Sequence, residues 1–156
     1  MKLRNILYVI FAVFVPYLSA NSQESISRRY SVGFSNPCYL SLKYDITDVF
    51  SAEARIGSQE GINVIGGRAY DILKKFNKTD LFAGVDAYYT FFNSNGVNGW
   101  GYAFSLLIGV EFHINDKLSV ALDLGPGFTK VFDSSDMSLS DEGWGIVDDI
   151  TFRVYF

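Results

Sequence analysis

From Arg29 onward, apolar and polar residues alternate with a period of two, and clusters of Gly, Asn, Asp and Ser interrupt the alternation. Neighbouring side chains of a strand point to opposite faces, so this pattern predicts strands. The spacing of an amphipathic helix is hard to find. The pattern predicts eight strands, at residues 29–35, 38–46, 49–57, 62–73, 80–92, 100–115, 117–132 and 145–156. We therefore expect an all-β protein with an even number of strands.

The clearest predicted strand runs from Gly101 to Ile114. One of its faces is continuously apolar, with Tyr102, Phe104, Leu106, Ile108, Val110, Phe112 and Ile114. The other face is small or polar, with Gly101, Ala103, Ser105, Leu107, Gly109, Glu111 and His113. The last strand repeats this division, since Ile150, Phe152, Val154 and Phe156 alternate with Asp149, Thr151, Arg153 and Tyr155.

Alternation alone does not say which face lies inside a barrel, and other features favour a polar interior. Gly, Ala and Ser dominate the polar face, and the narrow lumen of an eight-stranded barrel needs small groups. Several strands also reach the ~9–11 residues that a tilted strand needs to cross a bilayer. We therefore expect an antiparallel up-and-down transmembrane β-barrel whose apolar face contacts lipid.

An N-terminal export signal supports the same interpretation. Lys2 and Arg4 precede the apolar run from Ile6 to Val15, and small residues follow up to Ser22. The run is shorter than the ~20 residues of a spanning helix, which favours a cleaved signal over a retained anchor. We expect residues 1–22 to be a signal peptide and residues 23–156 to be one barrel domain. The chain has 156 residues, 49% of them hydrophobic, which is enough for one domain.

Connection lengths predict the orientation, because outer-membrane barrels combine short periplasmic turns with longer external loops. The predicted periplasmic turns are 47–48, 77–79 and 115–117, and the predicted external loops are 35–37, 57–61, 93–99 and 133–143.

Aromatic residues are expected in two girdles. The periplasmic girdle comprises Tyr44, Phe50, Phe112 and Phe156, and the outer one comprises Phe91, Trp100, Tyr102, Phe128, Phe132 and Trp144. Between Asn63 and Leu73 neither face is cleanly apolar, which predicts a bulge near Gly66-Gly67 and leaves the direction of Arg68 open.

Two segments resemble a known family. The C-terminal run Ile150-Thr-Phe-Arg-Val-Tyr-Phe156 resembles the terminal-phenylalanine signal of outer-membrane barrels, and Leu118-Ser-Val-Ala-Leu-Asp-Leu-Gly-Pro-Gly127 resembles their penultimate strand. The chain is thus similar to the small eight-stranded bacterial outer-membrane proteins of the OmpA/OmpX type. The resemblance implies location in the outer membrane and recognition by the barrel-assembly machinery. The residues that match the assembly signal are Ile150, Phe152, Val154 and Phe156.

The polar faces carry charges of both signs that are expected in the lumen. They are Lys43, Glu53, Arg55, Asp86, Glu111, Asp123, Asp149 and Arg153. Charges away from bulk water require partners, so we expect a salt-bridged polar core that closes the barrel. An ion path or proton relay is the alternative.

Other chemistry has little support in the sequence. His113 is the only histidine, and it is expected at the periplasmic end with its side chain in the lumen. Lipid A deacylases of the barrel type would need it near the outer leaflet.

The acidic residues Asp133, Asp136, Asp141 and Glu142 lack the spacing of an EF-hand, which leaves weak calcium binding as an alternative to a solvated loop. The 13 basic residues are scattered, Cys38 is the only cysteine, and neither nucleic acid nor a cofactor is expected.

The sequence therefore predicts a monomeric, non-enzymatic barrel that anchors surface loops for envelope integrity, adhesion or surface interaction. Its expected partners are outer-membrane lipid, the assembly machinery and a surface ligand bound by the external loops. One alternative is a barrel enzyme acting on lipid A as a deacylase or acyltransferase. Another is a soluble periplasmic barrel that carries a ligand.

Overall fold

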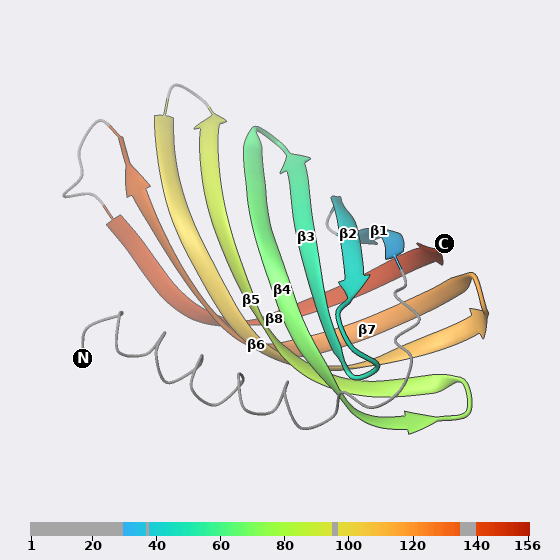
Figure 1. Cartoon of the computed structure of the whole chain (residues 1–156). Coiled ribbons are helices and arrows are strands. Elements are labelled where there is room, and N and C mark those ends of the chain that lie inside the picture. The colour runs from blue at the N-terminus through green and yellow to red at the C-terminus, as the bar shows by residue number, and fades with distance from the viewer. Residues whose placement is uncertain (1–29, 37, 95–96, 135–139) are drawn as a thin grey trace.

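The structure, a computed structural model, describes residues 30–36, 38–94, 97–134 and 140–156. The expected signal peptide and Asp136 lie outside these residues. The strands are β1 (Tyr30–Asn36), β2 (Tyr39–Asp45), β3 (Phe50–Gln59), β4 (Ile62–Phe76), β5 (Thr79–Ser94), β6 (Val97–Asn115), β7 (Leu118–Asp133) and β8 (Ser140–Tyr155). Each strand pairs antiparallel with the next, and β8 pairs with β1, so that the sheet closes into a ring (Figure 1). The predicted all-β, eight-stranded, up-and-down architecture is confirmed.

No helix among the described residues is long and apolar enough to cross a membrane.

Several strands are longer than the sequence predicted. β8 begins at Ser140, and Asp141 and Glu142 pair with Val131 and Lys130, so the connection expected at 133–143 is shorter. The connection expected at 93–99 is also largely paired, with Asn93 opposite Asn98. Gly, Asn and Asp predict loops from composition, but a hairpin continues wherever two backbones keep their register. The polar residues Asn93, Asn98, Asp141 and Glu142 therefore belong to the strands.

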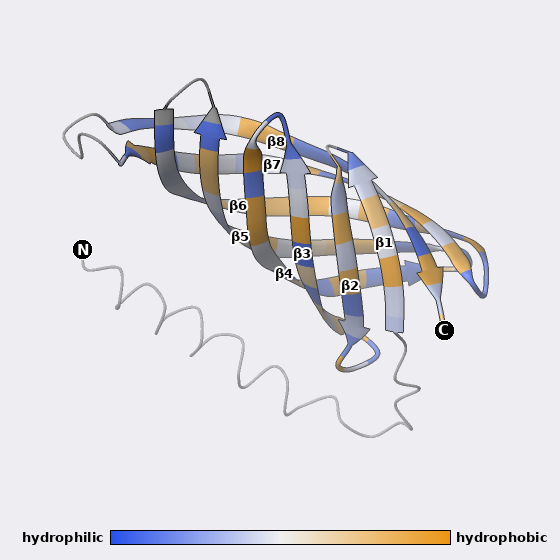
Figure 2. Cartoon of the chain, turned by 90° about the horizontal axis from the view of Figure 1, so that it is seen from above, coloured by the Kyte–Doolittle hydropathy of each residue, from blue (hydrophilic) through white to orange (hydrophobic). Residues whose placement is uncertain are grey.

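The two faces of the ring differ in the way the alternation predicted. On β6, Leu106 is 60% exposed, whereas its neighbours Ser105 and Leu107 are 4% and 5% exposed. Along the strands, apolar and polar residues form alternating bands (Figure 2). The polar side chains are the buried ones, and most large apolar side chains are exposed on the outer surface. The ring is thus inverted relative to the usual arrangement, in which apolar side chains are inside.

The bulge expected at Gly66-Gly67 is absent, and this prediction was wrong. Both glycines keep a regular register with Tyr88 and Ala87 on β5. A Cβ atom at Gly66 would collide with the ring of Tyr88, so the glycine makes room for that ring. The irregularity in β4 lies between Ile72 and Lys74 instead. Because the register is regular up to that point, Arg68 points into the ring and is 3% exposed.

Strand lengths are uneven around the ring. β1 and β2 have 7 residues each, whereas β6 has 19. β8 pairs with β1 only between Ile150 and Tyr155, and its first part extends past the end of β1. One side of the ring is therefore much shorter than the other (Figure 1).

Candidate functional site

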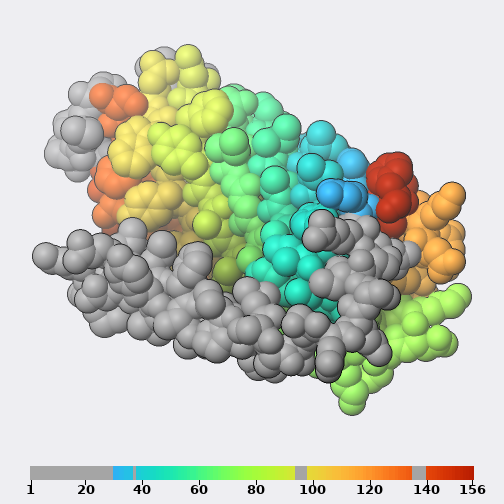
Figure 3. Space-filling model, viewed as in Figure 1, coloured from blue at the N-terminus to red at the C-terminus, as the bar shows by residue number. Residues whose placement is uncertain are grey.

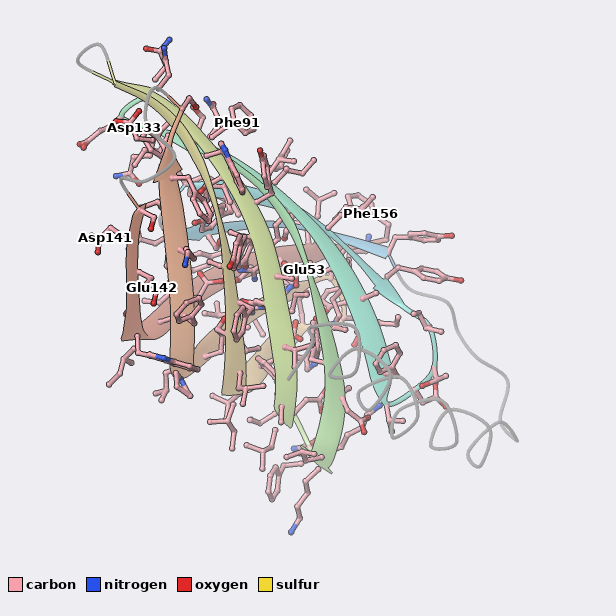
Figure 4. The ribbon with its side chains drawn as sticks, turned by 90° about the vertical axis from the view of Figure 1, so that its left-hand side faces the viewer. Glu53, Phe91, Asp133, Asp141, Glu142 and Phe156 are labelled. Atoms are coloured by element: carbon pink, nitrogen blue, oxygen red, sulfur yellow. The ribbon has the colours of Figure 1, made fainter. Side chains whose placement is uncertain are left out.

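The interior of the ring holds nine charged side chains that are almost fully buried. They are Lys43, Glu53, Arg55, Arg68, Asp86, Glu111, Asp123, Asp149 and Arg153. The sequence placed eight of these in the lumen, and Arg68 is the ninth. Glu53 is seen among the side chains near the middle of the ring (Figure 4).

One group of charges surrounds Arg68 on β4. Its Nε donates to Oδ1 of Asp86 on β5 at 2.7 Å, and its Nη1 donates to Oδ2 of Asp123 on β7 at 2.6 Å. Nη2 donates to the second oxygen of each carboxylate, at 3.0 Å and 3.1 Å. Both carboxylates are therefore held in two-pronged contacts, the geometry that suits a planar guanidinium. Arg68 ties three strands together through the interior.

Arg55 connects this group to the rest of the interior. Its Nε donates to Glu53 at 2.8 Å, and its Nη1 donates to Asp149 on β8 at 2.5 Å. Arg68 also lies 3.5 Å from Asp149. The hydroxyl group of Tyr88 donates to Asp86 at 3.1 Å. The two arginines and their carboxylates thus form one continuous network across the ring.

A second group of charges surrounds Glu111 on β6. One carboxylate oxygen accepts from Ser119 and Tyr155 at 2.5 Å each, and the other accepts from Lys43 at 3.2 Å. Arg153 reaches Glu111 at 3.5 Å and donates to Glu53 at 2.9 Å. Glu53 contacts both Arg55 and Arg153, so it joins the two groups.

The nine charges comprise four cations and five carboxylates. One carboxylate is thus in excess, and the hydroxyl groups of Ser119, Tyr155 and Tyr88 donate further hydrogen bonds to carboxylates of the network. Buried charges are tolerated only when they are paired and hydrogen-bonded in this way. A small apolar cluster of Tyr70, Phe82, Leu107 and Ala121 is also buried in the interior.

His113 occupies the end of the interior next to the β2–β3, β4–β5 and β6–β7 turns. Its Nε2 lies 3.1 Å from Oδ2 of Asp80, and its ring lies 5.8 Å from that of Tyr155. A cavity of about 180 Å³ opens here and is lined by Lys43, Asp45, Thr47, Asp48, Ile72, Lys75, Asp80, His113 and Tyr155. Ser105 lies farther along β6, opposite Asp86 and Gly127. The structure therefore does not bring the histidine and this serine together.

The acidic residues considered for calcium do not form a common site in the described part of the chain. Glu142 accepts a hydrogen bond from Lys130 at 2.5 Å, and it lies with Asp133 and Asp141 near one end of the ring (Figure 4). No group of three or more His, Cys, Asp or Glu residues among the described ones is arranged to hold a metal ion.

The outer surface carries the aromatic residues in two regions. Near the long hairpins, Trp100 stacks on Phe132 at 4.4 Å and on Tyr89 at 6.0 Å, and Phe128 contacts Trp144 at 5.4 Å. Near the opposite end, Tyr30 contacts Tyr44 at 4.8 Å, and Phe112 and Phe156 are exposed. In the space-filling view, the visible parts of β3, β4 and β5 pack side by side on one face of the ring (Figure 3).

Comparison with known proteins gave no match, either to a protein-family model or to a curated protein.

Proposed function

We propose that the protein is a non-enzymatic, integral outer-membrane β-barrel that anchors surface-exposed hairpins for envelope integrity, adhesion or surface interaction. The observation that carries the proposal is the inversion of the ring. Nine charged residues are buried inside it, and large apolar side chains are exposed on its outer surface over all eight strands. Exposed apolar patches of this extent are rare on soluble monomers.

A bilayer would remove the cost of exposing these apolar side chains to water, and it suits a ring of paired strands. Each apolar side chain that leaves water contributes about 1.5–3 kcal/mol when it is fully buried. Wherever neighbouring strands pair around the ring, their backbone groups are satisfied by one another, as the hydrocarbon region demands because water is absent there. The two aromatic regions fit the two membrane interfaces, where aromatic rings are enriched.

The lengths of the hairpins support an orientation. The β5–β6 and β7–β8 hairpins extend farthest beyond the polar network, whereas the β2–β3 and β6–β7 connections are tight. In the tight turns, the side chains of Thr47 and Asn115 accept hydrogen bonds from nearby backbone N–H groups. Short turns in the periplasm and long hairpins outside are typical of this class of barrel. The long hairpins would then be the parts that meet other surfaces.

The proposal is tested by extraction and by gel mobility. A membrane-embedded barrel should remain with the outer-membrane fraction through an alkaline wash and be released by detergent. It should also run faster on a denaturing gel before boiling than after, because the closed ring resists the detergent until it is heated. A protein that washes off and shows one mobility in both samples would instead fit the soluble, ligand-carrying barrel.

A further inference from the structure

The interior changes character above the charged network, towards the long hairpins. The inward positions there are Tyr39, Gly57, Ile62, Val64, Tyr88, Thr90, Phe92, Gly99, Gly101, Ala103, Gly127, Thr129, Gly143, Gly145 and Val147. We call the space that they surround the upper chamber. Below the rim none of these described residues carries a charge, whereas Asp141, which shares the inward face of β8, and Glu60 in the β3–β4 turn stand at the rim. The chamber therefore offers apolar and backbone surface where the lower interior offers ion pairs.

The ring pair of Tyr39 and Tyr88 forms the floor of the upper chamber. The two rings stack at 5.9 Å, and the hydroxyl group of Tyr88 lies within hydrogen-bond distance of both Arg55 and Asp86 in the charged network below. Beside this floor is a cavity of about 330 Å³, lined by Tyr39, Gly57, Ser58, Gln59, Glu60, Ile62 and Val64. A cavity of this size lies within the range of about 300–1,000 Å³ that is usual for small-molecule sites.

The opposite wall of the chamber leaves open space. A Cβ atom added at Gly143 or Gly145 of β8 would meet nothing within 4 Å. These glycines face inward, because Gly145 pairs with Gly127, which in turn pairs with the buried Ser105. The chamber is thus wide at β8.

The chamber is also open on one side. β1 ends at Asn36, β2 begins at Tyr39, and β8 pairs with β1 only as far up as Ile150. Among the described residues, no strand stands between the Ser140–Asp149 part of β8 and the end of β3 at Gln59. We call this the side opening.

The side opening lies at the level of exposed apolar residues. On β8, beside the opening, Ile146 is 81% exposed and Trp144 is 73% exposed. Trp144 belongs to the outer aromatic region through its contacts with Phe104 and Phe128. In a membrane, the lipid that surrounds these side chains would therefore also reach the side opening.

We propose that the upper chamber binds an acyl chain of an outer-leaflet lipid, which enters through the side opening above the β1–β2 turn. This inference rests on the proposed location in the outer membrane. A hydrocarbon chain needs no polar partner, which matches a chamber whose described charged residues stand only at its rim. The head group would stay at the membrane surface, near the unpaired backbone groups on the edge of β8.

The charges at the mouth favour a lipid over a free fatty acid. Glu60 lines the cavity, and Asp141 and Glu142 lie at the end of the β7–β8 hairpin. These carboxylates would repel the carboxylate of a fatty acid arriving from water. A chain that enters sideways from the membrane avoids them.

Tryptophan fluorescence provides the test, because the chain has only two tryptophans, Trp100 and Trp144, and both face outward. A Trp100→Phe/Trp144→Phe background with Val64→Trp carries its single indole in the chamber. The protein would be folded into phosphatidylcholine vesicles with brominated acyl chains, and bromine quenches indole on contact. We expect a loss of fluorescence comparable with that of the outward tryptophans in the unmodified protein. The Val147→Trp variant in the same background places a second probe on the opposite wall.

A filling variant separates entry of the chain from quenching through the wall. Gly145→Phe fills the open space and should abolish most of the quenching at the chamber probe. The matched control Ile146→Phe changes the next residue, on the outer face, and should leave the quenching unchanged. All variants are compared only where unboiled samples keep the fast gel mobility, so that misfolding is seen separately.

The outcomes distinguish this inference from the proposed function. If Trp100 and Trp144 are quenched but neither chamber probe is, or if Gly145→Phe has no effect, the chamber proposal is overturned and the membrane location stands. If the outward tryptophans are not quenched either, the membrane location fails as well. Quenching by added brominated fatty acid in ordinary vesicles, with none from brominated phospholipid, would overturn the lipid as the source of the chain.

Discussion

Arg68 donates more hydrogen bonds to carboxylates than any other side chain described above. It holds the carboxylates of Asp86 and Asp123 at once, each through two hydrogen bonds. A lysine could carry the charge but has no planar fork to serve two carboxylates in fixed directions. Because all three groups are almost fully buried, removing the cation leaves two buried carboxylates without the positive charge that pairs with them, and only the Tyr88 hydroxyl group still donates to Asp86.

Replacing Arg68 by methionine should therefore destabilise the barrel by about 3–5 kcal/mol, the usual result of removing one partner from a buried ion pair. Arg68→Lys should lie between the methionine variant and the wild type. Urea titration of the protein in vesicles, followed by the unboiled gel mobility, would show the change as a lower unfolding midpoint. Adding Asp86→Asn and Asp123→Asn to the methionine variant should restore much of the loss. An unchanged midpoint for Arg68→Met would mean that the network contributes nothing to stability.

The alternation of residues could place most of the charged network but not Arg68. Eight charged residues stand on clean polar faces, so a count of odd and even positions was enough to predict their direction. Between Asn63 and Leu73 both faces are mixed, and the glycines before Arg68 suggested a bulge. Gly66 instead makes room for the ring of Tyr88, which lies on another strand. Such a contact depends on register between strands, and one strand's sequence does not contain it.

At the scale of the strand, β7 lies so close to β6 at Gly125 that only glycine fits there. A Cβ atom at Gly125 would overlap the backbone carbonyl oxygen of Leu106. Pro126, the next residue, has no N–H group to donate to a ladder. Backbone pairing is accordingly missing between the Ser105–Gly127 pair and the Ile108–Leu124 pair, although the register is the same on both sides. The two strands come together here by contact rather than by regular pairing.

Gly125→Ala should consequently push β6 and β7 apart and destabilise the barrel by about 1–3 kcal/mol, as overpacking commonly does. The same change at Gly145 is the matched control, because a methyl group there meets nothing within 4 Å. Thermal loss of the fast gel form would compare the two variants. Equal transition temperatures for Gly125→Ala and Gly145→Ala would contradict the close approach.

The sequence predicted all eight strands but missed several of their ends. The interiors of the strands alternate strongly because one face is polar and the other apolar. The hairpin tips have no such contrast, and Ser140, Asp141 and Gly143 have the composition of a loop. Pairing there is maintained by the backbone of the opposite strand, as for Asp141 with Val131. Strand length beyond the apolar band was therefore not predictable from side chains.

For the whole molecule, the main competing function is an enzyme that acts on lipid A. His113, the histidine available as a general base, lies 3.1 Å from Asp80 at the end opposite to the upper chamber. The chamber, where a lipid chain would lie, has its described charged residues, Glu60 and Asp141, at its rim. A lipid in the chamber and the histidine would therefore be separated by the whole charged network.

We accordingly expect the same lipid A species from cells that produce the wild type, the His113→Asn variant or no protein. If His113 were a general base, its loss should lower the activity by about 10²–10⁴-fold while the barrel stays folded. Mass spectrometry of the extracted lipid A is the measurement. A deacylated or additionally acylated species that appears only with the wild type would establish the enzyme and refute the anchor.

The class of the fold could be predicted from the sequence, but the upper chamber could not. Its side opening results from β1 and β2 being short relative to β8, and from the way the strands are paired around the ring. No single segment shows this. The glycines on β8 could be noticed, but only the register shows that they face a space rather than a side chain.

The pairing of β1 with β8 has a consequence for the order of events when the chain folds. Every other pair of strands joins neighbours along the chain, whereas this one joins Ser31 to Tyr155 through six residue pairs. Closing so long a loop has the largest entropic cost, and contacts between distant residues form slowly. Until those six pairs form, the chain is a curved sheet with two free edges that other chains could join. A helper protein that shields these two edges until they meet would therefore act on the slowest and most vulnerable moment of assembly.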